Sequence, residues 1–114
     1  MWSIEYFRSS SGNCPVEEFI DSLDGRSRAK VARTLDLLEE FGVGLGMPYA
    51  KPLENRLWEL RVREGRNRYR VIYFLATGRT FVLLHGFSKK TSAVSRKEIE
   101  IAERRREEYQ SGRR

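Results

Sequence analysis

Several cationic residues are spaced so that a folded β-sheet would bring them to one surface. The run 57–63 alternates apolar and polar residues, which is typical of a half-buried strand and places Arg61 on its polar face. Arg70 lies on the next strand-like run and reaches the same face in one of the strand's two possible phases. Lys89 and Lys90 follow the last such run and lie beside that face.

These four cations have the chemistry of a phosphate site. Guanidinium groups match phosphate oxygens bidentately, and like charges held together destabilise a fold unless a ligand compensates them. Each cation alone is typical of an ordinary surface charge. Together, Arg61, Arg70, Lys89 and Lys90 predict a site that handles phosphate, and we take them as candidate catalytic residues.

His85, the single histidine, is a fifth candidate because imidazole titrates near neutral pH. Strand alternation places it on one face with Phe81, Leu83 and Phe87, which favours a partly buried, hydrogen-bonded structural role. The alternative is general acid or base catalysis. Glu59 presents the same choice, because it could act as a base or pair with an arginine across the sheet.

The elements that position these residues follow from apolar periodicity and turn residues. Alternation over 2–7 predicts a first strand, and apolar residues three and four apart predict helices over 15–23 and 27–41. Residues 42–52 hold three glycines and two prolines, which predicts a loop. Three further strands joined by short turns are expected over 57–63, 68–76 and 80–87.

Ser95 followed by Glu98 is a capping-box pattern that opens a last, largely polar helix to about Tyr109. The resulting order is β-α-α-β-β-β-α. It predicts an α+β domain in which a helical hairpin packs on one face of an antiparallel-type sheet. The other face of the sheet stays partly free.

Length and charge narrow the function classes. The 114 residues suit one domain, and 39% hydrophobic residues suffice for one core. The net charge of +6 is uneven, because residues 51–94 hold 10 bases and 3 acids whereas residues 1–50 hold 5 bases and 8 acids. This electropositive middle segment predicts an anion-binding surface, for which nucleic acid is the natural ligand.

Cysteine and hydropathy set further limits. Cys14 has no second cysteine to pair with, and one cysteine with one histidine makes no zinc cluster, so Cys14 is read as structural and no cofactor is expected. No apolar run approaches the length of a membrane helix, and the first residues lack a signal-peptide pattern. We therefore expect a cytoplasmic protein with no membrane partner.

Ordered motifs along the chain resemble a known family. They are Lys-Pro-Leu at 51–53, Leu-Trp-Glu-Leu-Arg at 57–61, Tyr-Arg-Val-Ile-Tyr at 69–73, Phe-x-Lys-Lys-Thr at 87–91 and Glu-Ile-Glu-Ile-Ala at 98–102. The set resembles the RelE/ParE superfamily of toxins from type II toxin–antitoxin systems, and within it the phage-derived HigB-like branch. The resemblance covers about residues 2–109 and has the same order of elements.

The resemblance implies a RelE-like fold and a metal-independent endoribonuclease that cuts messenger RNA in the ribosomal decoding site. In that chemistry the 2′-OH attacks the adjacent phosphate and the 5′-oxygen leaves. The partners it implies are the ribosome with its mRNA and a cognate antitoxin, often a helix-turn-helix protein. The domain would span residues 1–110, followed by a disordered basic tail at 111–114.

Matched residue by residue, Arg70 corresponds to the family's arginine in the Tyr-Arg strand. Arg61 and Lys90 correspond to basic positions before and after it. Glu59 and Leu57 stand where RelE has lysines, and residues 91–108 lack the tyrosine that RelE places near its C-terminal catalytic end. The general acid and base are thus unassigned by analogy, and Lys89, Lys90 and His85 are the candidates.

The electropositive segment would supply the RNA contacts. Its further candidates for binding the RNA backbone are Lys51, Arg63, Arg66 and Arg68. Two other functions stay open: a ParE-like inhibitor of DNA gyrase on the same fold, and a non-catalytic nucleic-acid-binding module.

Overall fold

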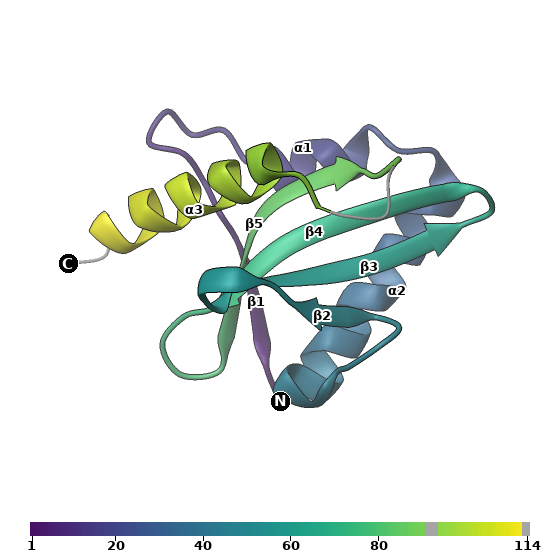
Figure 1. Ribbon diagram of the computed structural model, residues 1–114, viewed down its shortest axis with the longest axis horizontal. Helices are drawn as coiled ribbons and strands as arrows, with labels where there is room; N and C mark the ends of the chain where they lie inside the picture. The colour runs from purple at the N-terminus through teal and green to yellow at the C-terminus, as the bar shows by residue number, and fades with distance from the viewer. Residues whose placement is uncertain (91–93, 113–114) are drawn as a thin grey trace.

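Five strands form one mixed sheet in the computed structural model, which describes residues 1–90 and 94–112 (Figure 1). Across the sheet the strands lie in the order β1-β5-β4-β3-β2. Their bounds are Ser3–Tyr6 for β1, Ala50–Pro52 for β2, Trp58–Glu64 for β3, Asn67–Leu75 for β4 and Thr80–Ser88 for β5. The predicted α+β class, with a helical hairpin on one face, is confirmed.

The sheet is mixed because β1 pairs in parallel with β5, Ser3 lying opposite Thr80. All other neighbouring strands are antiparallel. Parallel neighbours need a long crossover connection, and here the helical hairpin and three strands lie between β1 and β5 in the chain.

Two helices form the hairpin, α1 over Pro15–Asp21 and α2 over Gly25–Phe41. Pro15 suits the first turn of a helix because its missing N–H would be unpaired there anyway. Asp24 caps α2 by accepting a hydrogen bond from the Ser27 backbone N–H at 2.8 Å. The apolar faces of both helices pack on one side of the sheet, in a core that contains Val16, Val31, Leu35, Leu38, Leu60, Val62, Val71 and Tyr73.

The last helix, α3 over Arg96–Ser111, packs on the opposite side of the sheet. Its N-cap is Ser95, whose hydroxyl accepts from the Glu98 N–H at 3.5 Å, as the capping pattern predicted. Ile99 and Ala102 form its narrow apolar stripe and pack with Ile72, Phe74, Val82 and Leu84. Helix α3 includes Ser111, the first residue of the predicted tail, and Arg113 and Arg114 lie outside the described residues.

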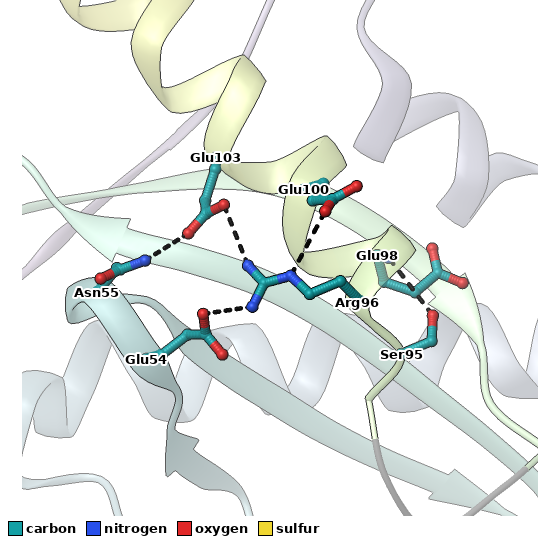
Figure 2. Close-up of polar contacts among 7 residues, drawn as sticks. All are labelled: Glu54, Asn55, Ser95, Arg96, Glu98, Glu100 and Glu103. Carbon is teal, nitrogen blue, oxygen red and sulfur yellow. Dashed lines mark hydrogen bonds and ion pairs between the residues drawn. The ribbon is translucent and has the colours of Figure 1, made fainter.

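A polar network ties the start of α3 to the turn before β3 (Figure 2). Arg96 lies 2.6 Å from Glu54 and 3.4 Å from Glu103. Asn55, whose φ is +58°, donates from its side chain to Glu103 at 2.6 Å. A single exposed ion pair contributes little to stability. This network, however, joins residues up to 48 positions apart in the sequence and so helps to position α3 on the sheet.

One predicted loop contains regular structure. Residues 42–52, expected as a loop, include a short 3₁₀ turn at Gly42–Gly44 and strand β2 at Ala50–Pro52. Among the strands of residues 1–90 and 94–112, β2 pairs with β3 alone, so it is an edge strand, the position where a sheet tolerates proline. Of the helices in the part of the chain that the structure describes, none has the length and apolar character that a membrane crossing requires.

Gly86 allows the close approach of β5 to α1, and a substitution at this position tests how tightly the two elements pack. A Cβ at this position would lie 2.6 Å from Cδ2 of Phe19. We expect Gly86→Ala to lower the free energy of unfolding by about 1–3 kcal/mol because of this overlap. Urea unfolding measures the change.

Gly44→Ala is the matched control, because a Cβ there would meet open space. Its free energy of unfolding is expected to change by less than about 1 kcal/mol. Equal stabilities of the two variants would contradict the packing described here.

Candidate functional site

The strand register brings four charged residues to one face of the sheet. Arg61 of β3 lies opposite Arg70 of β4, and opposed residues share a face. Lys89 follows β5 and its N–H donates to the Arg68 carbonyl at 2.8 Å, which extends the same pairing. Glu59 lies opposite Ile72, a residue of the α3-side core, so the group is on the α3 side of the sheet. We call Glu59, Arg61, Arg70 and Lys89 the buried cationic cluster.

Glu59 is the single acid of the cluster and is only 3% exposed. Its carboxylate lies 3.4 Å from Nε of Arg70 and 3.9 Å from Nε of Arg61. Arg70 is 4% exposed and donates from one terminal nitrogen to the Tyr69 carbonyl at 3.0 Å. The carboxylate thus pairs with an arginine across the sheet, which is one of the two roles that the sequence left open for it.

Lys89 is the most unusual cation of the group. It is 8% exposed, and its Nζ has no hydrogen-bond partner among residues 1–90 and 94–112. Burial lowers the pKa of Lys89, the charges of Arg70, Arg61 and Lys51 lower it further, and Glu59 acts in the opposite direction. Burial likewise lowers the pKa of Arg70.

This arrangement can stabilise an anion held at the surface of the cluster. Three cations face one carboxylate, and the buried Nε of Arg70 and Nζ of Lys89 make no hydrogen bond within the described residues. Buried polar atoms normally have partners, so these two donors keep unused bonding capacity beside the partly exposed Arg61, where a phosphate can approach. The described residues contain no group of three or more metal-ligating side chains close enough to hold an ion.

The remaining predicted cations fall into two sets. Lys51 lies opposite Glu59 on β2, and Arg63 lies opposite Arg68, so these three surround the buried cationic cluster on the same face. Arg66 and Lys90 instead line a hollow beside the turn between α1 and α2, whose wall also includes Arg68 and Lys89. Lys90 is exposed, so it lies beside the buried cationic cluster and not within it, and Thr91, the last residue of its motif, lies outside the described residues.

His85 lies apart from the cluster, at the contact between β5 and α3. Its Nε2 is 2.6 Å from Glu98, and Arg105 donates to its Nδ1 at 3.2 Å. Because a guanidinium only donates, Nδ1 accepts and Nε2 carries the hydrogen that is donated to Glu98. Burial lowers the pKa of His85, Arg105 adds to this effect, and Glu98 opposes it.

The face predicted for His85 is wrong in part. Ile72 pairs with His85 but Tyr73 pairs with Leu83, so Leu84 is the extra residue of a β-bulge. The bulge turns His85 away from the side of Leu83 and towards α3, where its ring stacks on Phe87 at 5.1 Å. The predicted partly buried, hydrogen-bonded position is confirmed.

Sequence reasoning missed Glu98 and Arg105 as the partners of His85. Glu98 was read only as part of the helix cap, and its carboxylate instead contacts His85. The signal was present, because residues seven apart lie two turns along the same helix face. That spacing places Glu98 and Arg105 together over β5.

The lowered pKa of His85 predicts how its removal changes the pH dependence of stability. Between the folded-state pKa and the ordinary value of 6.5, the unfolded chain binds a proton that the folded chain does not, so acid favours unfolding. We expect His85→Gln to lose less stability than the wild type between about pH 7 and pH 5. Urea unfolding at both pH values measures the difference, and an unchanged slope would contradict it.

Comparison with known proteins gives this geometry its context. A family model described as phage-derived protein Gp49-like (DUF891) matches residues 18–107, a span that contains the whole buried cationic cluster. Curated proteins give no significant match. Since the model covers most of its length, the chain belongs to the Gp49-like family, a phage-derived, toxin-like family of the RelE/toxin-like superfamily.

Proposed function

We propose that the protein is the toxin of a type II toxin–antitoxin system, a ribosome-dependent, metal-independent endoribonuclease that cuts messenger RNA in the manner of the HigB-like branch. The observation that supports this most directly is the buried cationic cluster. Arg70 and Lys89 are nearly inaccessible, Arg61 is partly exposed beside them, and the one carboxylate forms ion pairs with the two arginines. Membership of a toxin-like family supports the same function.

The proposed reaction is an internal transfer at phosphorus. The 2′-OH loses its proton, the 2′-oxygen bonds to the adjacent phosphorus, and the bond from phosphorus to the 5′-oxygen breaks. The 5′-oxygen takes up a proton from solvent, which leaves a 2′,3′-cyclic phosphate and a 5′-hydroxyl. Arg61 and Arg70 stabilise the charge that develops on the phosphate, because fixed cations in a site with little water act strongly on a transition state.

Lys89 is the best-placed proton acceptor among the three candidates. Its lowered pKa increases the fraction of neutral amine at a given pH, and its Nζ lies among the cations that would hold the phosphate. His85 is bonded to Glu98 and Arg105 at the α3 contact. Lys90 is exposed and lines the neighbouring hollow, whereas Lys89 is buried beside the two arginines. His85→Gln is therefore expected to keep most of the cleavage activity.

The partners follow from this function. The ribosome would hold the mRNA in line for attack, so orientation contributes part of the rate. A cognate antitoxin, a helix-turn-helix protein in this branch, would neutralise the toxin. Because the toxin would act on translation, it would work in the cytoplasm.

Primer extension on an mRNA translated in a reconstituted system tests the proposal. We expect new 5′ ends that require both the protein and the ribosome. A gyrase supercoiling assay on the same preparation tests the ParE-like alternative. Inhibited supercoiling with intact mRNA would overturn the proposal in favour of gyrase, and RNA binding without cleavage would leave a non-catalytic binding module.

Arg70 provides the first mutational prediction. Arg70→Gln alone would leave the carboxylate of Glu59 buried without its nearest cation, so the test combines it with Glu59→Gln. We expect the double variant to cleave roughly 100- to 1000-fold more slowly, because a transition-state contact is lost. Primer extension measures the rate, and circular dichroism verifies that the variant is folded.

Two controls isolate the effect of Arg70. Glu59→Gln alone keeps all three cations but leaves Arg70 buried without its carboxylate, so its folding is verified by circular dichroism as well, and the folded protein is expected to keep most of the activity. Arg33→Gln removes an exposed arginine of α2 on the other side of the sheet and is expected to change nothing. Wild-type cleavage by the folded double variant would contradict the assigned role.

Lys89 provides the second prediction, through the pH dependence of cleavage. Falling pH protonates Lys89 and removes the base, so the wild-type rate is expected to fall about tenfold per pH unit below the Lys89 pKa. Lys89→Arg keeps the charge but removes the base, and we expect a rate at least about 100-fold lower with this pH dependence lost. Single-turnover cleavage between about pH 6 and pH 9 measures both effects.

Lys90→Arg is the matched control, since Lys90 is exposed and outside the cluster. Its rate and pH profile are expected to equal those of the wild type. A Lys89→Arg profile that still falls in acid would assign the base to another group.

A further inference from the structure

A hollow of about 580 Å³ lies beside the buried cationic cluster, at the edge of β3. The pairing of β2 with β3 ends at Leu60, so the part of β3 that follows pairs with β4 on one side and borders this hollow on the other. Arg61 and Arg70 belong both to the cluster and to the wall of the hollow, which makes the two continuous. Its size is within the range of small-molecule sites, and a single nucleotide fits that range.

One wall of the hollow is apolar and exposed. The loop before β2 contributes Met47, Pro48 and Tyr49, of which Met47 is 63% exposed and Tyr49 is 41% exposed. The backbone of Tyr49 is fixed on both sides, since its N–H donates to Gly46 at 3.0 Å and its carbonyl accepts from Arg61 at 2.8 Å. An aromatic ring is thus presented at the surface from a hydrogen-bonded backbone.

The other walls are strongly cationic. They carry Lys30 of α2 and the arginines at positions 61, 63, 68 and 70, against the single acid Glu64. Arg61 also reaches across to the apolar wall, where its guanidinium lies 3.3 Å from the sulfur of Met47. A ligand that suits these walls carries negative charge and also has a flat apolar part.

We infer that this hollow binds an unpaired nucleobase of single-stranded RNA, with Tyr49 as the stacking surface. The inference rests on the proposed function, because the base belongs to a nucleotide next to the phosphate held at the buried cationic cluster. Single-stranded RNA combines a polyanionic backbone with flat bases, and proteins bind it through cationic grooves with aromatic rings. An acidic protein segment matches the charge of the hollow but gives the ring of Tyr49 no planar partner.

A 2′-O-methyl RNA hexamer with one 2-aminopurine base tests the inference, because it cannot be cleaved and its fluorescence falls on stacking. We expect the wild type to bind the hexamer and quench it. Tyr49→Ala is expected to bind about tenfold more weakly and to lose the quenching, and Tyr49→Phe to bind within about twofold of the wild type. Phe41→Ala is the matched control, since Phe41 is 51% exposed but does not line the hollow, and it is expected to change nothing.

Three results would overturn the inference: equal affinity of Tyr49→Ala and the wild type, failure of the wild type to bind the hexamer, or loss of affinity in Tyr49→Phe equal to that in Tyr49→Ala. A decapeptide of alternating Glu and Leu, bound in a Tyr49-dependent way when RNA binding is not, would assign the hollow to a protein partner. Cleavage of translated mRNA is scored separately with the wild type. Tyr49-dependent RNA binding without cleavage would overturn the proposed function and leave the base site standing.

Discussion

The pairing of Arg61 with Arg70 around the carboxylate of Glu59 is the constraint on which the rest of the site depends. Two arginines directly opposite each other are unfavourable, and a buried carboxylate alone is more so. The negative charge of Glu59 offsets the repulsion between the two arginines, and their positive charges stabilise the buried carboxylate. Their positions are set from the opposite face of the sheet, where Leu60 and Val71 are paired and fully buried. A slip of one residue would turn the charges into that core, so the hydrophobic packing holds the cations in register.

The position of α3 decides which part of this face is available for binding. Its apolar stripe is short, and Ile99 and Ala102 cover the sheet around Ile72 and Phe74. The network at Arg96 fixes the start of the helix, and the contact of His85 with Glu98 fixes its first turns to β5. Beyond this cover, the face of the sheet carries charge instead of apolar residues. On this face of the sheet, the part under α3 therefore contributes to the stability of the fold, and the part with the buried cationic cluster is left for binding.

The sequence predicted the features that follow from the alternation of apolar and polar residues. Alternation in 57–63 placed Arg61 and Glu59 on one face, and the structure has the phase of β4 that adds Arg70. The bulge at Leu84 broke the period of β5, and nothing in that uniformly apolar run indicates where the extra residue lies. Strand β2 was missed because three residues after a glycine-rich loop are too few to show a period. The burial of Glu59 and Lys89, and the hollow at Tyr49, arise from contacts between distant segments and are invisible to local patterns.

The parallel pairing of β1 with β5 has a consequence for how the chain is made. Ser3 is synthesised before its partner Thr80, which is added only after the hairpin and three strands. The cluster also needs β5, because Lys89 follows that strand. Contacts of such long sequence separation form slowly, and the nascent chain exposes an unpaired N-terminal strand until β5 is available. A protein of this topology therefore acquires its cationic surface only after β5 has been synthesised.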